Sequence, residues 1–208
     1  MDEVNSNSVA TFAVAPRAGV GIVCVRYNSN LSRVFYWNLQ DDSFEPGQMI
    51  KASAFVTTIS SDGKYFGYWA DDWGELVECY LCLAHVGYFS ALAWFPTYVN
   101  TVRNIQFLPN GNVEYVSNRA YAVRTGEVCP PDIITPGCPF EIHPASWDSI
   151  GHSDGLREWH DPRRDRRYWT ERNQLLYRVG ESEEVHILRT FERERFRAIP
   201  PPGWAQAW

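Results

Sequence analysis

The sequence has no long apolar run and no segment typical of a secretory signal. A membrane-spanning helix needs roughly 18 consecutive apolar residues, and no stretch of this chain approaches that length. Residues 1–8 are acidic and polar, whereas a signal segment begins with basic residues followed by apolar ones. We therefore expect a cytoplasmic protein without a membrane partner.

Cysteines are few, and their number, five, is odd. An odd thiol count without a signal segment fits a reduced compartment better than a disulfide-stabilised secreted protein. Cys79 and Cys82 have C-x-x-C spacing, and Cys129 and Cys138 could supply two further thiolates for zinc. However, side chains three positions apart in a strand point to opposite faces. We therefore expect buried structural cysteines and no metal or other cofactor.

Uncompensated positive charge is also absent. The net charge is −6, the first 100 residues are acidic overall, and the residues from 151 onward carry nearly equal numbers of acids and bases. A domain that binds nucleic acid normally presents a basic patch without interleaved acids. The sequence also lacks a phosphate-binding glycine loop, a dinucleotide fingerprint and an H-E-x-x-H pair. These absences argue against a nucleic-acid partner and against the enzymes that those motifs mark.

Aromatic residues, by contrast, are abundant. They make up 15% of the 208 residues, with nine Trp, eleven Tyr and eleven Phe. Large rings favour strands and extensive packed faces. The hydrophobic content of 45% and the charged content of 21% are those of an ordinary globular chain with one sizeable core. The composition therefore predicts an all-β protein.

The clearest local signal lies in residues 54–78. The stretch holds three β-rich runs, at 55–59, 64–69 and 75–83. Asp62 and Gly63 separate the first two runs, and glycine tolerates the positive φ that a tight hairpin turn demands. The stretch predicts a three-stranded antiparallel meander.

Four glycines recur at nearly even spacing, each within a turn signal. They are Gly19, Gly63, Gly111 and Gly155, separated by 44, 48 and 44 residues. A further run at 88–95 continues the unit of Gly63. Similar β-rich runs surround the other three glycines, at 9–14, 20–27, 33–39, 102–107, 113–116, 120–123, 147–150, 174–179 and 185–188. A charged insertion at 157–167 interrupts the fourth unit. A period of this length is typical of repeat architectures.

Three segments carry a resemblance to a known family. They are Ser-Ser-Asp-Gly-Lys-Tyr at 60–65, Phe-Tyr-Trp-Asn-Leu-Gln-Asp-Asp at 35–42 and Val-Arg-Thr-Gly-Glu at 123–127. They resemble blades of β-propellers of the WD-repeat or TolB-like kind, in which each blade is a four-stranded meander of about 40–50 residues. The resemblance implies a small propeller-like ring of about four antiparallel blades. Trp147-Asp148 and Gly151-His152 lie almost side by side, unlike the family pattern, so the resemblance carries over no activity.

Two other architectures stay open. Even glycine spacing also suits a β-sandwich or a large twisted antiparallel sheet. An incomplete ring could dimerise to cover its edges, so the protein is expected to be a monomer or a homodimer. We expect one domain at 1–190, followed by a charged tail at 191–208 that packs on the body through Trp204 and Trp208.

The resemblance to blades also predicts a binding face. Loops between the second and third strands of each unit would open on the same side, and they carry Trp and Arg, which are enriched at binding hot spots. The predicted binding residues are Asn28, Asp71, Asp72, Trp73, Asn118, Arg119, Trp159, His160, Arg163 and Arg164. In the alternative interpretation the tryptophans pack inward and the arginines pair with nearby acids.

The resulting prediction is a non-catalytic protein–protein interaction module. An inhibitor or an immunity-type partner of another protein is one such module. The alternative is a carbohydrate-active hydrolase or lyase in the ring centre, with Asp71, Asp72 or His160 as acid or base. A third option comes from residues 151–155, which resemble the Gly-x-Ser-x-Gly elbow of α/β-hydrolases, with Ser153 as nucleophile. Its partners would be Asp161 or Asp165 with His186, but Pro162 would end the required helix early, so we expect a simple turn there.

Overall fold

The computed structural model describes residues 8–73, 77–97, 105–115, 133–134, 138–144, 158–192 and 194–207. These residues form strands joined by turns, with one short 3₁₀ turn, so the predicted all-β class is confirmed. None of them forms a helix with the length and apolarity needed to cross a membrane. The strands are β1 Val9–Ala15, β2 Val20–Asn28, β3 Leu31–Asn38, β4 Ser43–Ile50, β5 Ser53–Ile59, β6 Tyr65–Trp73, β7 Val77–His85, β8 Ala91–Thr97, β9 Ile105–Phe107, β10 Val113–Tyr115, β11 Ile133–Ile134, β12 Ile142–Pro144, β13 Glu158–Asp161, β14 Arg166–Glu171, β15 Gln174–Val179 and β16 His186–Thr190.

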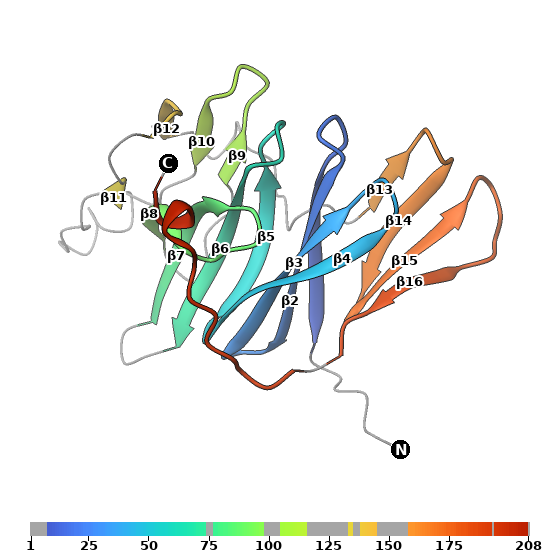
Figure 1. Cartoon of the computed structure of the whole chain (residues 1–208), viewed down its shortest axis with the longest axis horizontal. Coiled ribbons are helices and arrows are strands. Elements are labelled where there is room, and N and C mark those ends of the chain that lie inside the picture. Colours follow the sequence, from blue (N-terminus) through green and yellow to red (C-terminus); the bar gives the residue numbers. More distant parts are fainter. Residues whose placement is uncertain are drawn as a thin grey trace.

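The strands form four sheets, named here A to D along the chain (Figure 1). Sheet A has the order β1-β2-β3-β4, sheet B the order β11-β8-β7-β6-β5, sheet C the order β12-β10-β9 and sheet D the order β13-β14-β15-β16. Neighbouring strands are antiparallel, except for the parallel pair β10 and β12. Sheets A and D are therefore simple meanders, as is the β5–β8 part of sheet B.

The predicted hairpin around Gly63 is present as the β5–β6 pair. Gly63 has a φ of +72°, in the left-handed region that favours glycine. The Asp62 carboxylate accepts a hydrogen bond of 2.6 Å from the Ser60 hydroxyl and one of 3.1 Å from the Lys64 amide. These local bonds close the turn, and β7 continues the meander antiparallel to β6.

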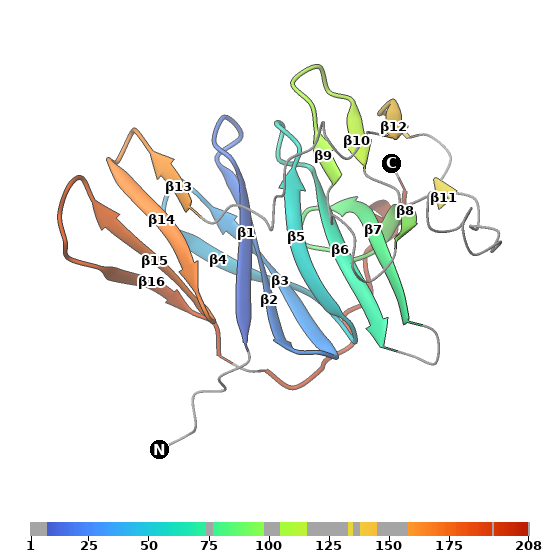
Figure 2. The same cartoon turned by 180° about the vertical axis from the view of Figure 1, so that it is seen from behind.

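Glycines with positive φ mark the first turn of three sheets. Gly19, Gly63 and Gly111 have φ values of +71°, +72° and +90°. The first two turns touch, because a Cβ built on Gly63 would lie 3.1 Å from the Ala18 Cβ. Figure 2 shows the three turns side by side at one end of the strands, which we call the Gly-turn end. Gly155 lies outside the described residues.

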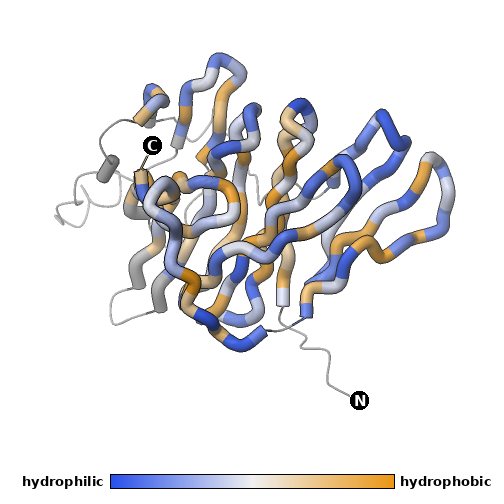
Figure 3. The backbone as a smooth tube through the Cα atoms, viewed as in Figure 1, coloured by the Kyte–Doolittle hydropathy of each residue, from blue (hydrophilic) through white to orange (hydrophobic). Residues whose placement is uncertain are grey.

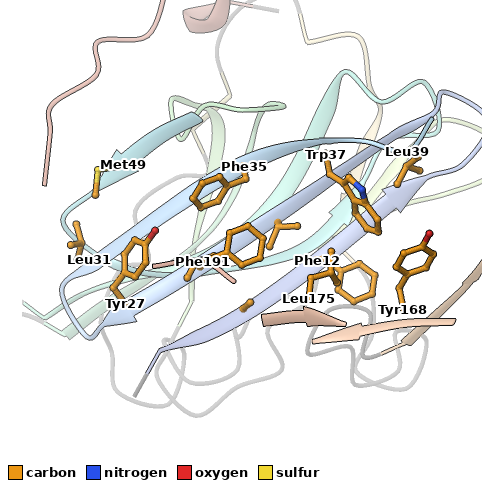
Figure 4. Close-up of a cluster of buried hydrophobic side chains, with 13 residues drawn as sticks. Phe12, Tyr27, Leu31, Phe35, Trp37, Leu39, Met49, Tyr168, Leu175 and Phe191 are labelled. Atoms are coloured by element: carbon orange, nitrogen blue, oxygen red, sulfur yellow. The ribbon is translucent and has the colours of Figure 1, made fainter. Parts of the chain in front are cut away.

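Successive sheets pack face to face in the order D, A, B, C, and each junction has its own buried cluster. Between D and A lie Phe12, Val23, Tyr27, Phe35, Trp37, Tyr168, Leu175 and Phe191, most of them labelled in Figure 4. Between A and B lie Ala13, Ile22, Cys24, Val34, Val56, Phe66, Tyr68 and Cys82. Between B and C lie Trp69, Cys79, Leu81, Leu83, Phe95, Ile105 and Val113. Figure 3 shows the same pattern in hydropathy, with apolar strand segments inside and polar turns outside.

Two strand assignments from the sequence were wrong. Residues 157–167, expected as a charged insertion, instead contain β13 and the start of β14. In that hairpin Trp159 lies opposite Tyr168, and both pack into the cluster between sheets D and A, while His160 and Arg167 form the next pair. Because successive side chains of a strand point to opposite faces, one face of this hairpin is aromatic and the other is charged.

Strand β4 was the second wrong assignment. The sequence analysis missed it because Pro46 and Gly47 are typical of a loop.

After leaving β16 of sheet D, the C-terminal segment runs past sheet A to sheet B, as the red trace in Figure 1 shows. In sheet A, Arg33 forms an ion pair with Glu194, and the Gln48 side chain donates a 3.1 Å hydrogen bond to the Ile199 carbonyl. In sheet B, the His85 ring lies 5.3 Å from the ring of Trp204, which belongs to the 3₁₀ turn Gly203–Gln206. We call residues 191–207 the C-terminal strap. Trp208 lies outside the described residues.

Candidate binding grooves at the Gly-turn end

Two adjoining grooves, which share Pro16 and Arg17, open at the Gly-turn end. The first, of about 630 Å³, lies between the turns of sheets A, B and C, and we call it the apolar groove. Its lining residues are Val14, Ala15, Pro16, Arg17, Ile59, Ser60, Ser61, Asp62, Phe107, Leu108, Pro109, Gly111 and Phe140. The second, of about 570 Å³, lies between sheets A and D, and we call it the arginine groove. Its lining residues are Pro16, Arg17, Ala18, Gly19, Leu39, Gln40, Trp159, Asp161, Pro162, Arg163 and Arg164.

The apolar groove has half-buried side chains on both walls. Ile59 comes from the end of β5, and Phe107 and Leu108 come from the end of β9 and its turn. Phe140 meets Phe107 edge-on, with ring centroids 5.2 Å apart. The apolar surface at this end is therefore built from turn and strand-end residues of three different sheets.

The arginine groove is shaped by the β13–β14 turn. The Asp161 carboxylate accepts a 3.0 Å hydrogen bond from the Arg163 amide, and Asp165 takes a φ of +50°. Asp and Asn tolerate this left-handed conformation better than most residues do. The turn thereby places the exposed Arg163 on the rim of the groove, beside Pro162.

Arg164 holds sheet D against sheet A. Its Nη1 lies 2.7 Å from Oδ2 of Asp42, its Nε lies 3.8 Å from Oδ2 of Asp161, and Nη2 donates to the carbonyls of Leu39 and Gln40. Burial alone would lower the pKa of Arg164, but the hydrogen bond to Tyr168 and the charge of Asp42 raise it instead. Arg164 is therefore a protonated structural link between two sheets, and its donors are largely used within the protein.

Trp159 and His160 occupy different environments. Trp159 is half-buried, stacks on Tyr168 at 5.2 Å with an interplanar angle of 20°, and meets Trp37 edge-on at 6.0 Å. His160 is exposed, and its Nε2 lies 3.3 Å from Oδ1 of Asp165. Trp159 thus contributes mainly to packing and also lines the groove.

The exposed charge along the grooves that no ion pair offsets is positive, although the whole chain carries −6. Arg17 and Arg163 are exposed, and neither forms an ion pair with any described residue. The nearby carboxylates of Asp42 and Asp161 are engaged by Arg164. Asp62 is engaged too: burial opposes its ionisation, yet hydrogen bonds from Ser60 and Lys64 lower its pKa.

The remaining predicted binding residues lie elsewhere. Asn28 ends β2 at the turn into β3, where its carboxamide oxygen accepts a 2.8 Å bond from the Asn30 amide. Asp71, which is 5% exposed, pairs in register with Ser53 at the start of β5. Both positions are at the end of the strands opposite the Gly turns, as are Asp72 and Trp73 at the end of β6. Asn118 and Arg119 lie outside the described residues.

The structure therefore divides the predicted face into two groups. Trp159, Arg163 and Arg164 line the arginine groove, and His160 lies beside it on the other face of β13. Asn28 and the residues 71–73 lie at the far end of the strands. The same separation keeps His160 away from Asp71 and Asp72, so these residues do not meet around one substrate.

Sequence reasoning missed Arg17 and the apolar residues of the β9–β10 turn. It assigned binding to the loops between second and third strands, whereas both grooves lie at the turns between first and second strands. A signal was present: Arg17 lies within the turn that ends at Gly19, and Phe107-Leu108-Pro109 brings apolar residues into a turn. Arg, Phe and Leu are not among the residue types that dominate tight turns.

The C-x-x-C pair separates as expected for a strand. Cys79 packs between sheets B and C, and Cys82 packs between A and B together with Cys24. Burial raises the pKa of Cys82 to about 12, well away from thiolate chemistry. The described residues contain no group of three or more potential metal ligands. Cys129 and Ser153 lie outside them.

Comparison with known proteins does not add to this description. The sequence matches no protein-family model, and comparison of the chain with curated proteins and with solved structures found no match.

Proposed function

We propose that this chain is a non-catalytic protein-binding module that holds an extended, acidic segment of a partner protein in the two grooves of the Gly-turn end. The observation that carries the proposal is the continuity of the grooves across Arg17. A partner segment there would meet apolar side chains on one side of Arg17 and the exposed Arg163 on the other.

The shape of the grooves favours a polypeptide over a small molecule. Small-molecule sites usually enclose most of their ligand, whereas these grooves open along the turns of four sheets. Peptide recognition typically combines apolar pockets for anchor side chains with a few charged contacts at the rim. Phe107, Phe140 and Ile59 supply the apolar walls, and Arg17 supplies a charged contact between the two grooves.

The charge of the grooves favours an acidic segment. Arg17 and Arg163 are exposed, while the carboxylates around them are engaged by Arg164, Arg166 and Lys64. Opposite charges raise the association rate and exclude basic competitors. An inhibitor or immunity-type role in the cytoplasm fits such a surface, and the buried free thiols Cys24, Cys79 and Cys82 are compatible with a reducing compartment.

We also propose that the four sheets are the blades of a small propeller-like ring. Support comes from the repeated Gly-turn hairpin at the start of sheets A, B and C and from the face-to-face order D, A, B, C. In a four-bladed ring, sheets C and D would also be neighbours. The described strands do not close into a ring, and in Figure 1 sheets C and D lie on opposite sides of sheets A and B. A crystal structure with sheets C and D in contact would support the ring, and one with the two sheets apart would contradict it.

A peptide-display selection tests the binding function. A random-peptide library is selected on the immobilised chain, and each enriched peptide is then titrated against the Arg17→Glu/Arg163→Glu variant. We expect enriched peptides to combine apolar and acidic residues, and we expect the variant to weaken their binding at least tenfold, because two attractive contacts become repulsive.

A charge-matched control comes from the C-terminal strap. Arg195 and Arg197 are exposed and lie away from both grooves, so Arg195→Glu/Arg197→Glu makes the same change in net charge. Binding by this control should equal that of the unaltered chain. Peptides that bind the groove variant as well as they bind the control, or a selection that enriches none, would contradict the proposal.

A further inference from the structure

The outer edges of sheets A and B are covered. In sheet A, β4 contains Pro46, which has no N–H to offer, and the Gln48 amide donates a 2.9 Å hydrogen bond to the Gly87 carbonyl. The strap also covers β4 through the bond between the Gln48 side chain and Ile199. In sheet B, β8 pairs with the two-residue strand β11, so the outermost strand offers only a very short edge. Exposed strand edges are templates for pairing with another chain, and these features prevent such pairing.

The outer edge of sheet D is different. Strand β16 pairs with β15 on one side, and across the described ranges no strand pairs with its other side. The strand contains no proline. A groove of about 580 Å³ runs along it, lined by residues 187–192 together with Phe35 and Glu194. This edge is therefore accessible to a further strand.

Exposed apolar side chains gather at the same edge. Within the described part of the chain, five large apolar side chains are exposed, and two of them, Phe196 and Trp204, lie on the strap. The other three belong to the β15–β16 hairpin: Val179 at 43% exposure, Val185 at 52% and Ile187 at 58%. Exposed apolar groups concentrated beside an open strand edge mark an interaction surface.

The charges along β16 favour one particular partner. Glu183 and Glu184 precede the strand, and Arg189 lies near its end; all three are exposed. In an antiparallel pair of two such strands, the acidic start of each copy lies beside the arginine of the other. A parallel pair would place like charges together. The edge is therefore complementary in charge to itself.

We propose that two copies of this chain associate by antiparallel pairing of β16 with β16, which joins two D sheets into one continuous sheet about a two-fold axis. Cross-strand hydrogen bonds supply the pairing, Val185 and Ile187 supply apolar contacts, and the Glu183/Glu184 pair with Arg189 sets the direction. The grooves of the Gly-turn end play no part in this association, so it stands independently of the proposed function.

Sedimentation equilibrium of the full chain, from micromolar to near-millimolar concentration, tests the proposal. We expect a reversible monomer–dimer equilibrium. Arg189→Glu should weaken the dimer about tenfold, because it turns two ion pairs into repulsions. The triple variant Glu183→Arg/Glu184→Arg/Arg189→Glu should restore the dimer, because it exchanges the charges without changing their complementarity.

Two further variants distinguish pairing of the β16 edges from nonspecific hydrophobic association. Ile187→Lys places a charge on the paired strand and should abolish the dimer, whereas Val179→Lys, on the same hairpin but in β15, should leave it nearly unchanged. All variants should retain the thermal midpoint of the unaltered chain measured at low concentration. A chain that stays monomeric at every concentration, or a dimer that Ile187→Lys and Arg189→Glu leave intact, would overturn the proposal.

Discussion

Arg164 and Asp42 form an ion pair of 2.7 Å across 122 positions of the chain. Asp42 also accepts a 3.0 Å bond from Arg166 and a 3.2 Å bond from Nε1 of Trp37. One carboxylate in the β3–β4 turn thus receives donors from both sheet A and sheet D. The first and last sheets of the described chain are joined by this group in addition to their shared apolar cluster.

Replacing Asp42 by Asn should destabilise the protein by about 2 to 3 kcal/mol, because two arginines lose a carboxylate in a partly buried site. Asn tolerates the φ of +59° at this position, so the change removes charge without adding backbone strain. Urea unfolding measures the effect. The neighbouring, exposed Asp41→Asn is the control and should have little effect; equal losses for both variants would contradict the role of Asp42.

Replacing Gly47 by Ala should destabilise the protein by about 1 to 3 kcal/mol, because a Cβ there would lie 2.4 Å from the Gly87 carbonyl oxygen. The clash would separate β4 from the β7–β8 turn and break the hydrogen bond between the Gln48 amide and Gly87. Gly203→Ala is a matched control, since a Cβ at Gly203 has nothing within 4 Å. Thermal unfolding of the two variants should differ clearly, and a Gly47→Ala protein as stable as the control would refute this packing.

Replacing Glu194 by Gln should loosen the C-terminal strap. Arg33, whose side chain is 9% exposed, would face a neutral carboxamide in place of its ion-pair partner, with the Gly47 carbonyl at 3.2 Å as its other acceptor. We expect a loss of about 1 to 3 kcal/mol, since a nearly buried charge is left with less compensation. Amide hydrogen exchange should also speed up over residues 194–199. Glu192→Gln, an exposed change in the same segment, should alter neither measurement.

The free energy of unfolding should decrease in alkaline solution because of the buried thiol of Cys82. Burial raises the pKa of Cys82 from 9.0 to about 12, so the folded protein keeps a proton that the unfolded chain releases. The free energy of unfolding is therefore unaffected by this group below pH 9 and decreases between pH 9 and about pH 12. Urea unfolding at several pH values should show a shallower decrease for Cys82→Ala than for the unaltered chain. Identical slopes would contradict the assignment.

Local sequence signals predicted the strands well where two of them agreed, namely turn residues at the strand ends and β-rich composition between them. Asp62-Gly63 gave the β5–β6 hairpin, and positive φ at Gly19 and Gly111 agrees with the predicted turns. Where the two signals conflicted, prediction failed. Glu45-Pro46-Gly47 has loop composition, yet an edge strand tolerates a proline because its outward N–H needs no partner.

The site was less predictable because it depends on which turns meet. Nothing local to Arg164 shows that it will reach Asp42, since that contact requires sheet D to pack on sheet A. Likewise, Arg17 and Phe107 share one groove only because sheets A, B and C align their first turns. Such contacts depend on how distant parts of the chain pack together as sheets. No short segment of the sequence shows this packing.

The C-terminal strap gives the protein an order of assembly. Its residues are synthesised after all four sheets, yet it contacts sheet A through Glu194 and sheet B through Trp204. On the ribosome, these contacts can therefore form only after the four sheets have been synthesised and the C-terminal strap has left the exit tunnel. A nascent or prematurely terminated chain consequently has the same four sheets without the contacts that the C-terminal strap makes to Arg33 and His85.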